Sequence, residues 1–396
     1  MHGDLGRAAR NSFGVVVVIA ALASLIFPYR MITERIQELA RERIASDERG
    51  VPLPPEWEAA VDELKAFVEA ERGLSFKRDV PVVVEPEEKF QERLAEEAEA
   101  YGSIDPADSY IALKALHLVD RRLDLESSED PLRDGGTLGY YDAYTNRLVV
   151  QGKRLTPFVR QILVHELTHA LQDQHFNLDR ELNEFDESYL AFEALVEGDA
   201  TRIENRYLES IPADERNQAA AEENAGVPQL DQEPNDSLQT LSMLSGFAYE
   251  VGDRFATEVF SAGGQERLDK AFVSPPTTTE QVLHPERFLT LQKPVKVPRP
   301  KAEGDVYEEG VWGERGLLTL LLRNLPEEQA WAAADGWAGD YYVAWKEGGR
   351  SCVRLSVVTD SRADKEELVL ALRSWALQQR LVSIAEGKTI QVRSCD

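Results

Sequence analysis

The sequence predicts an α+β fold in which a mainly helical domain with a small sheet precedes a C-terminal α+β unit. Three features of the 396 residues lead to this class. Apolar residues recur at helical spacing over much of residues 55–290, and two β-rich runs flank a polar turn at 138–150. After about residue 300, strand and helix patterns alternate. At 43% hydrophobic and 29% charged, the chain is long and apolar enough for two domains.

The net charge narrows the classes of partner. There are 44 Lys and Arg residues against 71 Asp and Glu residues, which gives a net charge of −27 at pH 7. An acidic surface repels the phosphate backbone, so we expect no nucleic-acid partner. The same charge argues against adhesion to an anionic membrane surface, although it allows a hydrophobic anchor.

Residues 1–30 are predicted to be a signal anchor or a signal peptide. Residues 13–27 are almost wholly apolar, and Arg7 and Arg10 precede them. A helix of that length spans roughly 22 Å, short of the ~30 Å hydrocarbon core, so a cleaved signal and a buried helix remain alternatives to an anchor. The charge order favours a body outside the cell membrane, either tethered to it by this single helix or secreted. Residues 31–50 are expected to form a charged helical stalk.

The domain at residues 51–299 is expected to begin with helices around a short strand and a hairpin. These elements are helices at 55–73, 86–100 and 106–122, a strand within 76–86, and the hairpin at 138–150. Two longer helices follow, one from residue 157 and one over 188–208. The polar stretch at 211–237, which contains Pro and Asn, predicts a mobile surface loop.

The C-terminal unit is placed at residues 300–396. Its predicted elements are helices at 310–325, 327–335 and 361–379, a hairpin of strands at 340–345 and 352–359, and a last strand at 389–395. Cys352 and Cys395 are 43 residues apart. In an oxidising compartment they could form a disulfide worth roughly 4 kcal/mol, and two buried thiols are the alternative.

Residues 165–169 carry the pattern H-E-x-x-H within the helix that begins near residue 157. Histidines four residues apart are separated by only about 40° around a helix, so His165 and His169 can face one metal ion. Glu166 projects in a neighbouring direction, where a carboxylate can hold and deprotonate a water molecule. Residues 158–163 are largely apolar, which predicts a buried helix whose polar side chains need a partner. The pattern therefore favours a zinc site over structural histidines.

A catalytic zinc site needs a third protein ligand. Glu197 is the preferred one, because it lies on the predicted second long helix and the adjacent Gly198 would let the zinc helix approach closely. Two alternatives remain. Glu193 lies one turn earlier, and His175 has the spacing of the third metzincin histidine. The metzincin pattern needs a helix-breaking glycine where this chain has Gln172, which weakens the case for His175.

The residues around these ligands carry a resemblance to known peptidases. HELTHALQDQHF with ALVEGDA downstream is similar to the gluzincin zinc peptidases, in which a Glu on a separate helix completes a His-His-Glu site. The interval to Glu197 resembles that of bacterial collagenase-type peptidases. More closely, the chain resembles a family of largely uncharacterised, exported microbial zinc metalloproteases, through residues 72–74, 139–142, 279–286 and 333–340. Thr201 departs from the collagenase-type pattern, which often has an acidic residue there.

This resemblance implies a zincin-like fold and zinc-dependent, endopeptidase-like hydrolysis of a peptide or protein substrate outside the cytoplasm. Zn²⁺ would be the cofactor, and Glu166 would act as the base. The hairpin at 138–150 would supply an edge strand to which an extended substrate adds by backbone hydrogen bonds.

Further polar side chains are candidates for roles beside the metal. Asp199 is a candidate to orient one ligand histidine through its other ring nitrogen, with a solvated charge as the alternative. The tetrahedral oxyanion needs a donor. The candidates for it are His284, Tyr249, Tyr140 and Tyr141. For His284 a capping or core role is the alternative.

Two other functions fit the same residues. A catalytically silent, zinc-stapled envelope protein could bind or assemble partners on a peptidase-like fold, although a purely structural site has no use for Glu166. An inhibited zymogen, with 211–237 or the N-terminal helices over the cleft, would show the same sequence pattern. The oligomeric state is left open.

Overall fold

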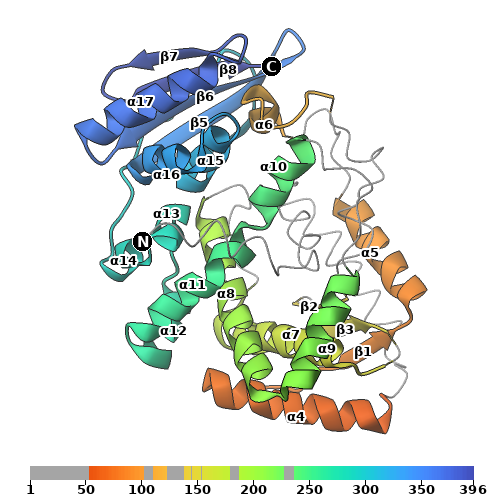
Figure 1. The fold of residues 1–396 in the computed structure, drawn as a ribbon. Helices are drawn as coiled ribbons and strands as arrows, with labels where there is room; N and C mark the ends of the chain where they lie inside the picture. Colours follow the sequence, from red (N-terminus) through yellow and green to blue (C-terminus); the bar gives the residue numbers. More distant parts are fainter. Residues whose placement is uncertain are drawn as a thin grey trace.

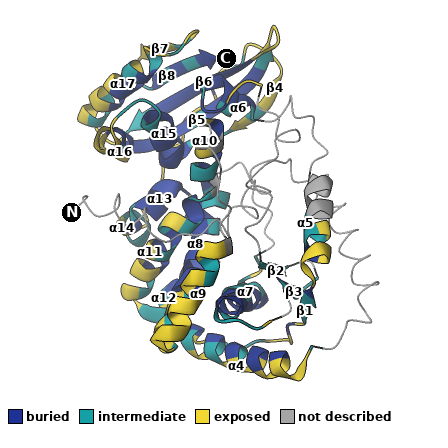
Figure 2. Cartoon of the chain, turned by 45° about the vertical axis from the view of Figure 1, so that its right-hand side comes forward, coloured by how far each residue is buried: buried dark blue, intermediate teal, exposed yellow. Residues whose placement is uncertain are grey.

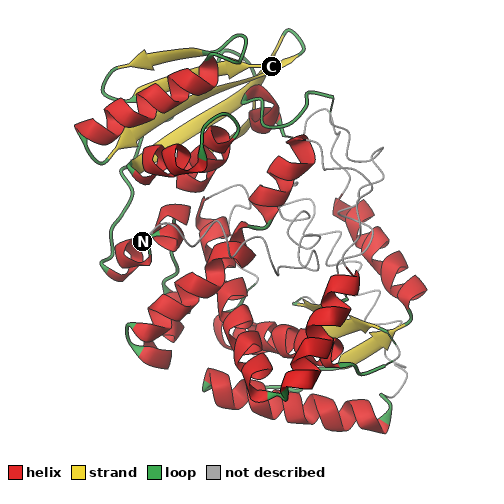
Figure 3. Cartoon of the chain, viewed as in Figure 1, coloured by secondary structure: helices red, strands yellow, loops and turns green. Residues whose placement is uncertain are grey.

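The computed structural model describes residues 53–101, 110–122, 138–143, 145–152, 154–178, 187–226 and 236–396. The predicted anchor and stalk at residues 1–50 therefore lie outside the described residues. Within the part that is described, no helix is long and apolar enough to cross a membrane. The described chain is mixed α+β and mainly helical, with two small sheets at opposite ends (Figures 1 and 3).

The N-terminal part of the molecule is helical with a three-stranded sheet. Its helices are α4 (Pro55–Arg72), α5 (Glu87–Tyr101), α7 (Pro157–Phe176), α8 (Glu187–Ser210), α9 (Ala213–Gly226), α10 (Asp236–Ser245), α11 (Phe247–Ser261), α12 (Gly264–Val273), α13 (Thr279–Leu283) and α14 (Pro285–Leu289). The sheet has the order β1 (Val82–Glu85), β3 (Arg147–Gln151), β2 (Gly139–Asp142), with β1 parallel and β2 antiparallel to β3. The predicted hairpin is thus confirmed, and β2 lies at one edge of this sheet.

Helix α7 carries the H-E-x-x-H pattern, and the residues next to its first turn determine where it starts. The Thr156 hydroxyl accepts a hydrogen bond from the backbone N–H of Val159, and Pro157 occupies the first turn. Leu163 and Leu167 are fully buried in one core with β3 and α4. Figure 2 shows α7 as largely buried, whereas α9 and the outer face of α4 carry exposed residues. The H-E-x-x-H pattern therefore lies on an interior helix, as the apolar residues before it predict.

Helix α8 packs against α11 at a crossing of two glycines. A Cβ atom on Gly198 would lie 2.1 Å from the backbone oxygen of Gly252, and a Cβ on Gly252 would lie 2.4 Å from the backbone oxygen of Ala194. No side chain fits between the two backbones. Gly198 was expected to allow close approach of the zinc helix; the helix that comes close at Gly198 is α11.

The C-terminal unit is a five-stranded antiparallel sheet with helices packed on it. The strands are β4 (Val306–Gly310), β5 (Trp337–Glu347), β6 (Arg350–Thr359), β8 (Ile390–Cys395) and β7 (Ser383–Glu386) in that spatial order, and the helices are α15 (Gly313–Leu322), α16 (Glu327–Asp335) and α17 (Arg362–Ala376). The hairpin β5–β6 turns at Gly348 and Gly349, both with positive φ, and the Ser361 hydroxyl caps α17. A short helix from earlier in the chain, α6 (Ile111–Ala115), shares this core.

Three of the sequence-based expectations for elements were wrong or incomplete. The predicted loop at 211–237 contains helix α9, and α10 begins within its last residues. The run that forms α9 is rich in Ala and Glu, which favour a helix even where almost no apolar face is present. In the predicted helix at 106–122, the described residues are helical only over α6. Strands β4 and β7 were not predicted at all.

Cys352 and Cys395 form a disulfide. The two residues lie directly opposite each other on the neighbouring strands β6 and β8, with Cα atoms 4.1 Å apart. Both are buried. Of the two alternatives that the sequence left open, the structure has the disulfide.

Candidate metal centre

Two helices bring the predicted ligands to one point. Helix α7 presents His165 and His169 one turn apart, and α8 presents Glu197 opposite them. The Oε2 atom of Glu197 lies 3.2 Å from Nε2 of His165 and 3.3 Å from Nε2 of His169. These three side chains are only 11–13% exposed. They form a group in which one atom from each residue could bind the same metal ion.

The far side of each imidazole is also fixed. Nδ1 of His165 lies 2.8 Å from Oε2 of Glu204, and Nδ1 of His169 lies 3.1 Å from Oε1 of Gln172. An acceptor at Nδ1 keeps the hydrogen on that nitrogen and leaves the Nε2 lone pair available for a metal. Two imidazole nitrogens and one carboxylate oxygen, each held in this orientation, fit the requirements of a divalent cation site.

The ionisation of these groups follows from their mutual contact. Burial disfavours the charged form of His165, but hydrogen bonds to Glu197 and Glu204 outweigh burial and raise its pKa well above the usual value. For Glu197, burial acts to raise the pKa, but the charges and hydrogen bonds of His169 and His165 prevail and hold its pKa far below the usual range. The carboxylate is therefore ionised and attracts positive charge to the point where the two rings meet.

Glu166 lies between the metal-ligand group and the edge of the small sheet. Its Oε2 atom accepts a hydrogen bond of 2.8 Å from the backbone N–H of Tyr141 on β2. Burial raises the pKa of the Glu166 carboxyl above its usual value, while His169 and His165 act in the opposite direction. Strand β2 can lie this close to α7 because Gly139 has no side chain: a Cβ atom there would lie 2.8 Å from Cγ2 of Ile162.

Of the four candidate oxyanion donors, Tyr249 on α11 is the one that contacts a ligand. Burial raises the pKa of Tyr249 well above its usual value, the charges of Glu197 and Glu193 add to this, and its side chain is hydrogen-bonded to Glu197. The side chains of the other two tyrosines have different neighbours. The Tyr141 hydroxyl donates to Asp173 at 2.9 Å, and the Tyr140 ring lies 5.9 Å from the ring of Phe90.

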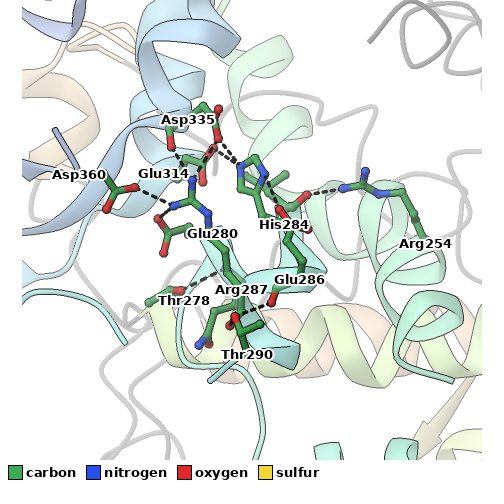
Figure 4. Close-up of polar contacts among 12 residues, drawn as sticks. Arg254, Thr278, Glu280, His284, Glu286, Arg287, Thr290, Glu314, Asp335 and Asp360 are labelled. Atoms are coloured by element: carbon green, nitrogen blue, oxygen red, sulfur yellow. Dashed lines mark hydrogen bonds and ion pairs between the residues drawn. The ribbon is translucent and has the colours of Figure 1, made fainter. Parts of the chain in front are cut away.

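The structure does not bring His284 to this group. Its Nε2 atom lies 2.9 Å from Glu314 and 3.2 Å from Asp335, both in the C-terminal unit (Figure 4). Helix α13 ends at His284. Its residue Thr279 contacts Glu187, the first residue of α8. Glu187 precedes Glu197 by ten residues, or about 15 Å of helix. His284, Glu314 and Asp335 form a second group that could hold a metal ion, but Arg287 already donates to Asp335 there.

Neither of the two alternative third ligands joins His165 and His169. Helix α7 continues without a break to Phe176, and the Nε2 atom of His175 lies 2.8 Å from the backbone oxygen of Ser75. Within the described part of the chain, neither His175 nor Glu193 belongs to a group that could bind a metal with His165 and His169. Glu197 is the carboxylate that forms such a group with His165 and His169.

Two residues that support the ligands differ from the expectation. Asp199 was a candidate to orient a histidine directly, but Gln172 lies between it and His169: the Gln172 amide donates to Asp199 at 3.1 Å. Glu204, which contacts His165, was not predicted. It lies seven residues after Glu197, hence on the same face of α8, and this spacing is the only signal in the sequence that could have identified it. Thr201 is buried on the same helix.

Comparison with protein families, with curated proteins and with solved structures finds no match for this chain. The geometry and chemistry of these side chains are therefore the basis for a function.

Proposed function

We propose that the protein is a gluzincin-type zinc peptidase with a zincin-like peptidase domain, and that it cleaves peptide bonds in an endopeptidase-like manner. The zinc ligands are His165, His169 and Glu197. The observation that carries the proposal is the position of Glu197 Oε2, within 3.3 Å of both Nε2 atoms and supplied by a second helix. The second supporting observation is Glu166, because a purely structural zinc site has no use for a base beside it.

A zinc ion held by these ligands would supply Lewis acidity, which polarises a carbonyl group and lowers the pKa of water. Glu166 takes the proton from the attacking water and passes it to the leaving nitrogen. Its hydrogen bond from Tyr141 N–H holds the carboxylate beside the edge of the sheet. Tyr249 keeps its proton at neutral pH, and its hydroxyl donates that hydrogen to the ionised carboxylate of Glu197. We propose that the hydroxyl turns from Glu197 to the developing oxyanion during the reaction.

The substrate proposed is an extended peptide lying along β2. Backbone groups of alternate residues in an antiparallel strand point in opposite directions, and the N–H of Tyr141 points to Glu166 rather than to β3. Gly139, two residues earlier, therefore has its backbone groups on the same outer edge. Among the described strands, none pairs with this edge. A peptide bound there lies next to Glu166 and the ligand group.

We place this activity outside the cytoplasm, on a cell-membrane anchor or in a secreted form. The Cys352–Cys395 disulfide supports this location, because such bridges persist mainly in oxidising compartments. The apolar run at residues 13–27 provides the route of export.

The proposal is tested with the full chain and its Glu166→Gln variant. We expect about one zinc per chain in both proteins. Cleavage of a fluorescently labelled, unfolded protein such as casein should fall by a factor of roughly 100 or more in the variant, because general-base catalysis is lost. Glu209→Gln, an exposed change at the end of α8, is the matched control and should keep full activity.

Two results would count against the mechanism. Equal cleavage by wild type and the Glu166→Gln variant would show that Glu166 is not the base. One zinc per chain with no cleavage by the wild type would favour the alternative function, a zinc-stapled envelope protein that binds or assembles partners without turnover.

A further inference from the structure

The side chain of Gln172 is fully buried, and its amide group has partners on both sides. Nε2 donates to the backbone oxygen of Val196 and to Oδ2 of Asp199, both at 3.1 Å. Oε1 lies 3.1 Å from Nδ1 of His169. An amide rotated by 180° would set its oxygen against two acceptors that have no hydrogen to offer. Val196 and Asp199 therefore fix the orientation of the amide, and the amide in turn fixes the hydrogen on Nδ1 of His169.

Asp199 is held just as firmly. Its side chain is fully buried, and Oδ2 accepts hydrogen bonds both from Gln172 and from Nε of Arg72, the latter at 2.7 Å. Oδ1 accepts from Arg202 at 2.9 Å. The position of this carboxylate therefore depends on Arg72. The same carboxylate is the acceptor for the Gln172 amide.

Arg72 lies in the last turn of α4 and is also fully buried. Besides Asp199 it contacts Asp269 of α12, with Nη1 2.6 Å from Oδ1. Its guanidinium carbon lies 5.5 Å from the ring centre of Phe176 and 5.4 Å from that of Phe272. Replacing a buried ion pair of this kind by well-packed apolar residues is often neutral for stability, so its clearer effect is to fix where Asp199 lies.

We propose that Arg72 and Asp199 are positioning residues for the metal ligand His169 and act on it through the Gln172 amide. The contacts form one continuous series from α4 and α12 to the ligand: Arg72 holds Asp199, Asp199 orients Gln172, and Gln172 orients His169. The inference rests on the proposed function in one respect only, that His169 binds the metal. The two histidines would then have different supports. Nδ1 of His165 faces a carboxylate on α8, and Nδ1 of His169 faces an amide whose own partner, Asp199, is held by an ion pair.

The test uses the full chain with Asp199→Asn and Gln172→Met. Zinc affinity is measured by competition with a chelator, and ligand geometry by the visible absorption of the Co²⁺-loaded protein. Asp199→Asn weakens one of the two acceptors that orient the Gln172 amide and leaves the Val196 carbonyl as the other, so the amide is held less firmly. Gln172→Met removes the acceptor for Nδ1 altogether. Each should weaken zinc binding roughly 10-fold or more, which is the usual effect of losing an outer partner of a ligand, and should change the cobalt spectrum.

Asp269→Asn is the matched control. It removes the other carboxylate of Arg72 but leaves the contacts from Asp199 to His169 in place. We expect it to lower the unfolding temperature while zinc affinity and the cobalt spectrum remain those of the wild type. A merely structural role of the Arg72 cluster would instead make Asp199→Asn and Asp269→Asn alike in all three measurements.

The inference is overturned if both test variants bind zinc with wild-type affinity and give the wild-type cobalt spectrum. If Asp199→Asn does not fold, Gln172→Met still tests the last contact of the series, because Arg72 and Asp199 reach His169 through that amide. Wild-type zinc affinity and an unchanged cobalt spectrum in Gln172→Met would then overturn the inference. A wild-type chain that takes up no zinc refutes the proposed function and this inference together, whereas unchanged variants of a zinc-binding wild type refute the inference only.

Discussion

Glu187, the first residue of α8, shows how a single buried carboxyl controls stability. Its side chain is hidden from solvent and accepts two hydrogen bonds from Thr279, from the backbone N–H at 2.5 Å and from the hydroxyl at 2.8 Å. Burial raises the pKa of Glu187 to about 8, more than these hydrogen bonds lower it. Between pH 4.5 and 8 the carboxyl is therefore protonated in the folded state and ionised in the unfolded state. Because the folded state binds one proton more, the free energy of unfolding falls as the pH rises through that window.

We therefore expect Glu187→Gln to stabilise the protein at high pH. Glutamine has the shape of the protonated acid and cannot ionise. In urea unfolding, the variant should match the wild type at pH 5 and exceed it on the order of a few kcal/mol at pH 9. Glu258→Gln, on the exposed face of α11, serves as the control and should show no such pH-dependent gain. A constant difference between Glu187→Gln and wild type across this range would contradict the expectation.

At this same scale, the sequence predicted which side chains meet between α7 and α8 better than it predicted the residues that support them. His165 and His169 could be assigned because a spacing of four residues on one helix fixes their relative direction. Glu204 and Gln172 could not, because the acceptor that each Nδ1 meets depends on how α8 crosses α7. Asp199 was selected for its charge and position next to Glu197, but it acts one side chain further away.

The crossing of α8 and α11 is the contact between elements that places Glu197 beside Tyr249. It requires Gly198, where an added Cβ would meet the Gly252 backbone at 2.1 Å. A backbone atom cannot move aside as a flexible side chain can, so Gly198→Ala forces the two helices apart. We expect a loss of stability of about 3 kcal/mol or more, together with weaker zinc binding, because overpacking shifts the helix that carries Glu197.

Thermal unfolding and chelator competition on the same samples check this prediction. Glu258→Ala, on the exposed side of α11, is the control and should change stability by no more than about 0.5 kcal/mol. A Gly198→Ala protein with wild-type unfolding temperature and zinc affinity would show that the helices do not meet as closely as described.

Elements with their own local signals were predicted well, and elements without such signals were not. The hairpin β5–β6 follows from two glycines at a tight turn, and α17 follows from its Ser361 cap. Strand β4 has no apolar alternation, since its residues are mostly exposed at a sheet edge. Helix α9 has almost no apolar face, and a polar stretch without such a face predicts a loop.

At the scale of the whole molecule, the N-terminal part and the C-terminal unit are joined by an ionic cluster around His284 and Arg287 (Figure 4). Arg287 donates to Glu280 within the N-terminal part and to Asp335 and Asp360 in the C-terminal unit. His284 faces Glu314, Asp335 and Glu286 besides Arg287. Charged contacts thus tie α13 and α14 to α15, to α16 and to Asp360, which lies between β6 and α17.

This joint should weaken as the pH rises. Burial and Arg287 act to lower the pKa of His284, but its contacts with Glu314 and Asp335 prevail and raise the pKa above 6.5. The imidazolium therefore contributes full stability below pH 6.5, and the contribution is lost as the pH rises through the raised pKa. His284→Gln should be less stable than the wild type by roughly 1–3 kcal/mol at pH 5, and the gap should narrow at pH 9.

Urea unfolding of wild type and His284→Gln at both pH values gives this difference directly. In both variants the stability relative to the wild type rises with pH, because each removes a group whose pKa is raised on folding. The two effects can still be separated at pH 5, where His284→Gln should lie below the wild type and Glu187→Gln should equal it. A gap that stays constant or widens toward pH 9 would show that His284 is not an imidazolium at this joint.

Sequence patterns predict a boundary between two parts near residue 300, but they do not predict that α6 packs in the core of the C-terminal sheet. Residues 111–115 are apolar apart from Lys114, and nothing in their order specifies the sheet against which they pack. Capping by Glu308 of β4, whose carboxylate accepts from the backbone N–H groups of Ile111 and Ala112, is a contact between residues almost 200 positions apart. Such pairings arise only in the folded chain.

The central claim is that one divalent ion binds between α7 and α8. Anomalous scattering at the zinc edge, from crystals of the zinc-loaded full chain, tests this claim most directly. We predict a single strong peak bounded by Nε2 of His165, Nε2 of His169 and the carboxylate of Glu197. No peak at that position, or a peak only at the group formed by His284, Glu314 and Asp335, would contradict the account.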